Sequence, residues 1–549
     1  MTDFTNGVLS LAGGSVLRQQ YSPYNDRQIN SYSLGFYGQD EWHVNSNLKL
    51  TLSLRLDRNS NETCPSHCFE HFSGDFIGGM SHNVATPYNQ SVLVGQSELF
   101  SSLERIVWQP RAGFAWSPGF HKSTVVRGGA GIFSDLYPAQ LSTNLLSNPP
   151  NTAIWTVAAS GADIPIAPGL ANGAFAQAAA NNAAFVNGFA DGGTLASIKA
   201  VVPTFNGPNF YSTTPHMLNP RYAEWNLEVE QAFGDKMVAS VNYVGNHGSK
   251  LLILTNGTNA FVKAGTTFGS LPATAPDPRF GVVTNLTNNG ISNYNGLTAS
   301  LSRRLTKGFT GTLGYTYSHS LDNISNAGID QYSLNQVGDS LRYQVDPQNG
   351  RLNYGNADYD FRHVLNLNYV WEVPFMARNR WIGGWTISGV LFKRTGQPYS
   401  VVNTGIPGKL LGNYSTTGGY VMADFLGGPT PSCTVNVACL TGAQFATTAT
   451  QADFGNIARN GFRGPGYFDT DLSIKKTFRI TENGLAFTLG ANAYNILNHP
   501  NFGNPDSSVT SGTFGTVQNT VTPASSPYGN FQGAAVSGRI LQLELKVKF

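Results

Sequence analysis

Hydrophobic and polar residues alternate one by one over many stretches of about ten residues. Because successive side chains of a β-strand point to opposite faces, each stretch predicts a strand with one apolar and one polar face. The clearest stretch, 48–57, follows a similar one at 32–44 after only three residues, which predicts a hairpin. The apolar positions of the clearest stretch are Leu48, Leu50, Leu52, Leu54 and Leu56.

This hairpin unit recurs along the chain and predicts thirteen strands. They are expected at 32–44, 48–57, 107–117, 124–135, 224–233, 237–245, 293–305, 309–320, 362–373, 380–393, 468–480, 485–497 and 538–549. Short turns alternate strictly with long connections at about 58–106, 136–223, 246–292, 321–361, 394–467 and 498–537. Connections above ~15 residues are rare in compact soluble domains. Short turns at one end of a sheet and long loops at the other are typical of outer-membrane barrels.

A bilayer explains both the alternation and the strand length. Lipid cannot pair backbone N–H and C=O groups, so strands cross a membrane only as a closed barrel. About ten residues of tilted strand span the apolar layer. The alternative is a soluble β-sandwich, whose strands average 5–6 residues. We therefore expect an all-β, antiparallel transmembrane β-barrel with short periplasmic turns and long extracellular loops.

Composition agrees with this expectation and excludes several other classes. Charged residues make up 12% of the chain, about half the usual ~25%, while aromatics reach 12% and Gly 61 of 549 residues. A disordered chain would be rich in charge and poor in aromatics. No apolar run approaches the ~18 residues of a spanning helix. The net charge of +2 is far below the positive charge that is typical of nucleic-acid-binding proteins, so no nucleic-acid partner is expected.

The four cysteines form two close pairs in loop-like surroundings, Cys64 with Cys68 and Cys433 with Cys439. An even number of cysteines in adjacent pairs predicts two local disulfides in an oxidising compartment. Free thiols are one alternative. A metal site at Cys64, His67 and Cys68 is another, but no fourth ligand or second cysteine arm is obvious.

Tyr and Trp rings favour membrane interfaces, where the ring is partly apolar and its polar group stays hydrated. Seven of them lie at or near ends of the expected strands, and we expect them to form interface girdles. A ligand-stacking role for a single ring is the alternative. The seven are Trp42, Trp108, Trp116, Trp225, Tyr369, Trp371 and Trp385.

The Ala/Gly/Asn-rich segment 167–200 predicts a short helix within the second long loop. Packing over the barrel mouth is favoured there over a dedicated binding site. The apolar residues of the segment are Leu170, Phe175, Phe185, Val186 and Phe189.

Sequence motifs for catalysis are absent. We find no nucleophile elbow, zinc-protease, phosphate-loop or haem-attachment motif. The run Gly128-Gly129-Ala130-Gly131 lies inside an expected strand and lacks the context of a dinucleotide site. Asp360 and His363 lie close in sequence, but no nucleophile can be tied to them, so a structural role is favoured. We therefore assign no catalytic, cofactor-binding or metal-binding residue and expect the chain not to be an enzyme.

Ten segments in order resemble the C-terminal β-barrel of TonB-dependent outer-membrane receptors, in the Oar-like group, over nearly the whole chain. They are FYGQDEW (36–42), LTLSLRLD (50–57), QPRAGFAWSP (109–118), VVRGGAGIF (125–133), YVGNHGSKL (243–251), SNYNGL (292–297), YTYSHSLDN (315–323), DYDFRH (358–363), RGPGYFDTDLSIKKTF (463–478) and NAYNILNHPNFGNP (492–505). The C-terminal strand adds a match to the signal read by the barrel-assembly machinery. Its residues are Leu541, Leu543, Leu545, Val547 and Phe549.

The resemblance implies a barrel of 22 strands, of which this chain would hold about thirteen. Residues 1–30 would then be the remnant of an extracellular loop, and 31–549 the receptor-like barrel domain. Family members carry a plug and a carboxypeptidase-regulatory-like domain ahead of the barrel, and neither is found here. The start of the sequence has no signal-peptide pattern. We therefore expect this sequence to be the distal part of a receptor.

The implied function is substrate uptake or passage across the outer membrane of a Gram-negative-type bacterium. The implied partners are outer-membrane lipid, the barrel-assembly machinery and, with a plug upstream, an inner-membrane energy-coupling complex; no cofactor is implied. One alternative is a passive porin-like channel. Another is a surface adhesion or scaffold protein that acts through its long loops, and a hydrolytic outer-membrane enzyme is third. The substrate is not readable from sequence.

Overall fold

A computed structural model describes most of the chain. The described residues are 6–10, 16–24, 26–119, 123–137, 141–159, 161–255, 258–263, 266–272, 275–323, 325, 349–374, 379, 381–403, 421–430, 437–479, 485–520 and 538–548.

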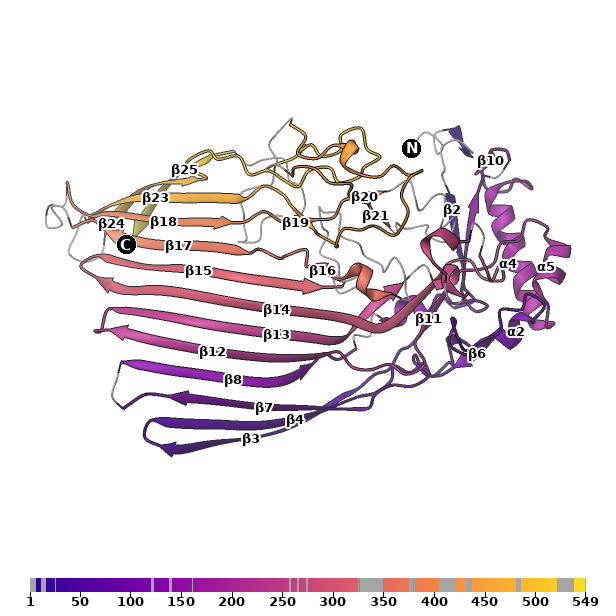
Figure 1. Ribbon diagram of the computed structural model, residues 1–549, viewed down its shortest axis with the longest axis horizontal. Coiled ribbons are helices and arrows are strands. Elements are labelled where there is room, and N and C mark those ends of the chain that lie inside the picture. Colours follow the sequence, from indigo (N-terminus) through magenta and orange to yellow (C-terminus); the bar gives the residue numbers. More distant parts are fainter. Residues whose placement is uncertain are drawn as a thin grey trace.

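One large antiparallel sheet holds all thirteen predicted strands, which confirms the expected all-β architecture (Figure 1). Neighbouring strands in the sheet are also neighbours among these thirteen along the chain. The strands are β3 (Ser33–Asn45), β4 (Leu48–Asn59), β7 (Ile106–Trp116), β8 (Thr124–Ser134), β12 (Arg221–Phe233), β13 (Met237–Thr255), β14 (Val283–Thr306), β15 (Phe309–Asp322), β17 (His363–Glu372), β18 (Trp385–Arg394), β23 (Tyr467–Arg479), β24 (Ala486–Tyr494) and β25 (Ile540–Lys548).

The short turns lie at one end of the sheet, at the left of Figure 1. One two-residue turn joins β14 to β15, where Thr306 pairs with Phe309 across Lys307 and Gly308. Both central residues have positive φ, 50° and 77°, which is the backbone of a two-residue hairpin turn. Such a turn leaves no room for a functional loop between β14 and β15.

Two strands are longer than predicted. Residues 246–292 were expected to form a loop, but β13 continues to Thr255 and β14 begins at Val283. Pairing resumes after irregularities near Gly248 and Leu251, and Ile253 then lies opposite Thr287. A bulge shifts the alternation by one residue, so the period-two pattern is lost although the strand continues. These extensions project beyond the short strands on the loop side.

The long connections fold at the opposite end of the sheet, at the right of Figure 1. Their strands are β1 (Val8–Leu9), β2 (Val16–Tyr21), β5 (Phe69–Phe72), β6 (Val92–Gln96), β9 (Ala153–Ala158), β10 (Ile164–Pro165), β11 (Phe210–Thr213), β16 (Gly355–Asn356), β19 (Pro398–Tyr399), β20 (Val402–Asn403), β21 (Val421–Met422) and β22 (Phe462–Arg463). Their helices are α2 (Tyr88–Ser91), α3 (Ser142–Leu145), α4 (Ala174–Ala190) and α5 (Leu195–Val201), with 3₁₀ turns η2 (Thr258–Phe261), η3 (Phe268–Ser270), η6 (Gly350–Asn353) and η8 (Gly442–Gln444). In the described part of the chain, none of these helices has the length and hydropathy to cross a membrane.

The hydrophobic core lies in these folded connections rather than against the sheet. Its largest cluster packs Trp155 and Phe185 with Tyr88 and Phe280, which belong to three different long connections. The helix predicted within 167–200 is present as α4 and α5, and Phe185 is its fully buried anchor. Residues near the start of the chain join the same body, since β2 pairs with β9. We call this body, formed by the folded long connections, the loop cap.

The sheet is not closed. Among the described residues β3 and β25 are its two ends, and they do not pair with each other. Each edge therefore presents a row of backbone groups without a strand partner. This agrees with the expectation of a partial barrel.

Candidate functional site

The register of the thirteen strands places most of the charged side chains of the sheet on one face, while Asp40, Arg58, Arg221, Arg303, Lys393 and Lys476 lie on the other. Directly paired residues point to the same side, and side chains alternate along each strand. Following the pairs from β3 to β25 gives one continuous polar face. Its charged residues include Glu41, Lys49, Arg55, Asp57, Arg111, Arg127, Glu228, Glu230, Asp471, Lys475 and Glu544.

Charges on the polar face are paired across strands. Lys49 Nζ lies 2.6 Å from Glu41 Oε2, and Arg127 Nη1 lies 3.1 Å from Glu230 Oε2. Lys475 Nζ reaches Glu544 Oε2 at 2.7 Å, across the intervening strand β24. The two side chains can meet across β24 because the residue between them, Gly490, has no side chain. Exposed ion pairs contribute little stability, so their consequence is a hydrated, charged surface.

The polar face has a small hollow beside its first edge. Its volume is about 180 Å³, and Gln39, Ser53, Arg55 and Arg111 line it. Arg55 Nε donates to Asp57 Oδ2 at 2.8 Å, while Gln109 donates to the same carboxylate. Arg111 stacks 4.2 Å above the Phe133 ring. The hollow therefore presents fixed guanidinium groups to whatever occupies this side of the sheet.

The opposite face is apolar and carries all seven predicted girdle aromatics. Trp42, Trp116, Trp371 and Trp385 lie near the short-turn end, while Trp108 and Trp225 lie nearer the loop end. Tyr369 is on the same face, two residues from Trp371. This face also carries the exposed Leu541, Leu543 and Leu545 of β25, whose neighbour Phe549 lies outside the described residues. The girdle and assembly-signal roles stay predictions, but the faces are those that these roles require.

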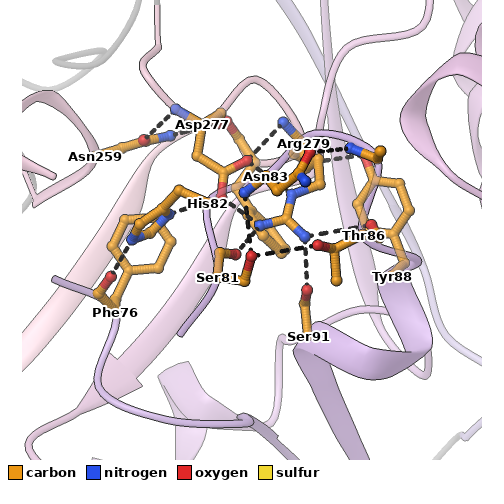
Figure 2. A network of polar contacts seen from close by, with 12 residues as sticks. Phe76, Ser81, His82, Asn83, Thr86, Tyr88, Ser91, Asn259, Asp277 and Arg279 are labelled. Atoms are coloured by element: carbon orange, nitrogen blue, oxygen red, sulfur yellow. Dashed lines mark hydrogen bonds and ion pairs between the residues drawn. The ribbon is translucent and has the colours of Figure 1, made fainter. Parts of the chain in front are cut away.

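Buried ion pairs hold the loop cap together. Figure 2 shows Arg279 and Asp277, both fully buried, with Nη2 and Oδ2 2.7 Å apart. Arg279 also donates to Ser91 Oγ at 2.6 Å and to the Thr86 carbonyl at 3.3 Å. Tyr88 Oη donates to the Arg279 carbonyl at 2.8 Å. The pair thus joins the connection after β4 to the connection after β13.

His82 completes this network. Its Nδ1 lies 2.9 Å from Asp277 Oδ2, and its Nε2 lies 2.7 Å from the Phe76 carbonyl oxygen. The two ring nitrogens thus contact two different oxygens, one on Asp277 and one on the backbone. Burial alone would raise the pKa of Asp277, but the hydrogen bonds from His82 and Arg279 outweigh it and lower that pKa.

A second buried cluster joins later connections. Arg459 is fully buried, pairs with Asp322 and lies 3.3 Å from Asp358 Oδ1. Burial lowers the pKa of Arg459 to about 9, so the side chain stays charged at neutral pH. Removing either partner would leave an uncompensated buried charge. The first cluster joins the connections after β4 and β13, and the second joins those after β15 and β18. Ring contacts of Phe261 and Phe268 with Phe454 link these two parts of the loop cap.

Glu70 is buried between the cap and the start of the chain. Burial raises its pKa to about 8, and this effect exceeds the opposing hydrogen bond from Asn151 and the charge of Arg27. Burial likewise raises the pKa of Glu62 to about 7. Glu70 is therefore largely protonated at neutral pH and Glu62 about half protonated, unlike exposed carboxylates.

The structure places the remaining sequence candidates as follows. A disulfide joins Cys64 and Cys68, and His67 Nδ1 lies 3.1 Å from the Gly95 carbonyl oxygen. Cys439 is disulfide-bonded, but Cys433 lies outside the described residues, so that pairing stays a prediction. Asp360 pairs with Arg362 and Arg463, whereas His363 contacts the Tyr315 hydroxyl at 2.7 Å.

Asp360 and His363 therefore have separate partners. Sequence reasoning missed the buried networks of the cap, because arginines that end up buried look like any loop arginine. The short spacing of Asp277 and Arg279 is the one local signal for such a pair.

A sequence model of the family described as outer membrane beta barrel domain matches residues 1–542. No curated protein matches the chain significantly.

Among solved structures, the outer membrane transporter YddB from Escherichia coli is 10% identical, with a TM-score of 0.43 over 95% of this chain and 54% of that chain. The ferripyoverdine receptor of Pseudomonas aeruginosa is 9% identical, with a TM-score of 0.39 over 95% and 39%. The siderophore receptor PirA, also from Pseudomonas aeruginosa, is 9% identical, with a TM-score of 0.35 over 85% and 46%. This chain thus spans about half the length of the transporter. Likenesses this weak carry no argument about ligands.

Proposed function

Since the chain belongs to the outer membrane beta barrel domain family, we propose that it is part of a TonB-dependent transporter-like receptor that takes up a substrate across the outer membrane. In this proposal residues 31–549 form the receptor-like barrel domain and 1–30 belong to an extracellular loop. The chain itself carries out no catalysis. An inner-membrane complex would supply the energy through a plug.

One observation carries the proposal: a continuous polar face that bears cross-strand ion pairs runs across all thirteen strands and leads to a folded cap. A transmembrane sheet with an apolar outer face needs a hydrated interior for such charges. The interior then offers paired, exchangeable charges to a polar plug or solute. The cap places a specific surface at the outer entrance, which a simple sieve does not require.

A thiol-accessibility experiment tests which face is hydrated. Ser53 lines the polar hollow and Leu52 is 60% exposed on the other face. In outer membranes, a membrane-impermeant, charged thiol reagent should label Ser53→Cys and leave Leu52→Cys unlabelled. Labelling of Leu52→Cys alone would reverse the faces and remove the basis of the proposal.

Whether uptake depends on the inner-membrane energy complex separates the proposed receptor from a passive channel and from an adhesion protein. Cells that express the native gene are given a panel of labelled solutes too large for general porins. We expect gene-dependent accumulation of one class, which is lost when the inner-membrane energy complex is deleted. Accumulation that persists after this deletion would identify a passive porin-like channel. Surface binding without accumulation would identify an adhesion or scaffold protein, for which the packed loop cap is the favouring observation.

A further inference from the structure

The small hollow on the polar face lies just below the base of the loop cap. Towards the cap, the Asp57 and Gln109 side chains are only 4% and 2% exposed, so the polar face is covered there. Arg55 and Arg111, two residues further from the cap on the same strands, are partly exposed and line the hollow. The hollow is smaller than the ~300 Å³ at which pockets for whole ligands begin, so it fits one functional group of a larger solute.

Asp57 and Gln109 connect the two guanidinium groups through one chain of hydrogen bonds. Arg55 holds the Asp57 carboxylate with both Nε and Nη2, each 2.8 Å from a carboxylate oxygen. Gln109 donates to the same carboxylate, and it accepts from Arg111 Nη2 at 3.3 Å and from the Ser134 backbone N–H at 3.2 Å. These contacts hold both guanidinium groups beside the same hollow.

Two glycines leave the space that the arginines occupy. Gly131 lies directly opposite Arg111 on β8, and a Cβ there would lie 2.8 Å from Arg111 Cγ. The Arg111 side chain therefore lies over β8, with its guanidinium carbon 4.2 Å from the centre of the Phe133 ring. Gly35 makes room for Arg55 in the same way, since a Cβ there would lie 2.5 Å from Arg55 Nη2. An alanine at either glycine would displace the neighbouring arginine.

The hollow carries one positive charge that no carboxylate balances. Asp57 matches the charge of Arg55, whereas Arg111 has no ion pair among the described residues. Arg111 Nε is buried and has no hydrogen-bond partner in the part of the chain that the structure describes. The Ser53 hydroxyl and the Gln39 amide, which also line the hollow, are further hydrogen-bond donors. A group with acceptor oxygens and one negative charge complements this lining.

We propose that the hollow binds a carboxylate group of the solute that passes along the polar face, an inference that rests on the proposed uptake function. The carboxylate lies between Arg55 and Arg111 and accepts hydrogen bonds from the guanidinium N–H groups that Asp57 and Gln109 leave free. A carboxylate suits the site because a planar guanidinium can donate to both of its oxygens at once. Its single negative charge balances Arg111, whereas a phosphate dianion would leave excess negative charge beside Asp57.

Two alkylating reagents test the site at a cysteine placed in the hollow, Ser53→Cys. Iodoacetate carries a carboxylate, and iodoacetamide is its uncharged counterpart. Both reaction rates are followed by mass spectrometry in outer membranes from cells that express the native gene with this substitution. We expect the ratio of the iodoacetate rate to the iodoacetamide rate to be about five-fold higher than at Ser300→Cys. Ser300 is the matched control because it lies on the polar face and its direct strand partners, Ser240 and Gly314, are uncharged.

Two substitutions test the arginine and its placement. Arg111→Gln should lower the rate ratio at Ser53→Cys to the value at Ser300→Cys, because it removes the unbalanced charge. Gly131→Ala should lower the ratio by a smaller factor, because it displaces Arg111 while the charge stays nearby. Gly38→Ala is the matched glycine control and should leave the ratio unchanged, since a Cβ at Gly38 would meet no atom within 4 Å. An unchanged ratio at Ser300→Cys in each variant shows that the sheet is still folded.

Competition identifies the chemical group that binds. At equal ionic strength, excess acetate should slow the reaction of iodoacetate with Ser53→Cys, and inorganic phosphate should slow it less. Equal or stronger competition by phosphate would replace the carboxylate assignment with a general oxyanion site.

Two further results would overturn the proposal. Equal rate ratios at Ser53→Cys and Ser300→Cys would mean that the hollow binds no carboxylate. A Ser53→Cys thiol that reacts with neither reagent, while Ser300→Cys reacts with both, would identify a protein segment as the occupant. Labelling is measured without transport, so failure of the proposed uptake is distinguishable. A raised ratio without energy-dependent accumulation would overturn the uptake and keep the carboxylate site.

Discussion

Leu52 and Ser53 are neighbours in the chain but face different media. Leu52 is 60% exposed on the apolar face, and Ser53 lies opposite Arg111 on the polar face. In a membrane the exposed fraction of Leu52 meets lipid, so exposure there is favourable rather than a defect. Whether a strand residue faces lipid or the polar side therefore depends on whether its position along the strand is even or odd.

Leu52→Arg should cost about 2–4 kcal/mol of folding free energy, because a charge near mid-strand meets hydrocarbon. Thr51→Arg is the matched control, since its direct strand partner is Glu41 and it stays hydrated. Ser53→Arg should also be mild, with a small cost from the facing Arg111. Folding yield into liposomes, followed by urea titration, measures the difference. Equal effects would mean that the faces or the membrane are wrongly assigned.

Glu70 makes the stability of the loop cap depend on pH. Its pKa is about 8 when folded, above the ordinary 4.5, so the folded state binds an extra proton between these values. Stability from this group is full below about pH 4.5 and falls as pH rises toward 8. The full change in stability over this pH range is on the order of 5 kcal/mol.

We expect Glu70→Gln to flatten the decline in cap stability between pH 5 and 8, since the amide keeps an acceptor for Asn151 without titrating. Near-UV circular dichroism during urea unfolding at several pH values measures this. The exposed Glu98→Gln is the control and should leave the slope as in the wild type. An unchanged slope in Glu70→Gln would show that Glu70 does not hold that proton.

At the scale of elements, the two ends of each hairpin differ in accessibility to the outside. The short turns at 45–47 and 306–308 lie at one end, and the connections 136–223 and 394–467 belong to the other. Exposed loops are the preferred sites of proteolysis.

Protease added to intact cells should cut within 136–223 or 394–467 and spare both short turns, which would face the periplasm. Fragment masses identify the sites, and cells with a permeabilised outer membrane provide the control. Cleavage at 45–47 or 306–308 in intact cells would invert the orientation.

The second disulfide belongs to the same loop face. We expect Cys433 and Cys439 to be joined, since five intervening residues close easily in an oxidising medium. Mass spectrometry of a non-reduced digest should show both this link and Cys64–Cys68. Alkylation of Cys433 without reductant would contradict it.

At the scale of the whole molecule, the open edges of β3 and β25 are the main threat to stability in a membrane. With thirteen strands in an up-and-down order, both edge strands run in the same direction, so a seam between them would be parallel. Bacterial single-chain barrels have even numbers of strands. Lipid cannot satisfy the free backbone groups of either edge.

We therefore expect the 549-residue chain alone to be unstable or prone to aggregation in membranes unless further strands complete the sheet. Refolding in detergent, followed by gel mobility with and without heating, measures this. A known closed barrel treated in parallel is the control. A sharp, compact, SDS-resistant band from this chain would favour a self-sufficient porin instead.

The amino-acid sequence by itself determined the strands, their two faces and the separation of short turns from long loops. Alternation over 48–57 defines both the strand and its lipid side, because the period of two follows from local backbone geometry. The same local reasoning failed where β13 passes its bulges, since a bulge changes the parity without ending the strand.

Only the tertiary structure decided the interior of the cap and the hollow on the polar face. Arg279 and Asp277 are buried by partners almost 200 residues away, such as Ser91 and Ser81, and no local pattern specifies such contacts. The hollow depends on which side chains become neighbours across β3, β4 and β7. The local sequence thus determines which segments form strands. Burial and cavities, in contrast, depend on strand register and on contacts between distant segments.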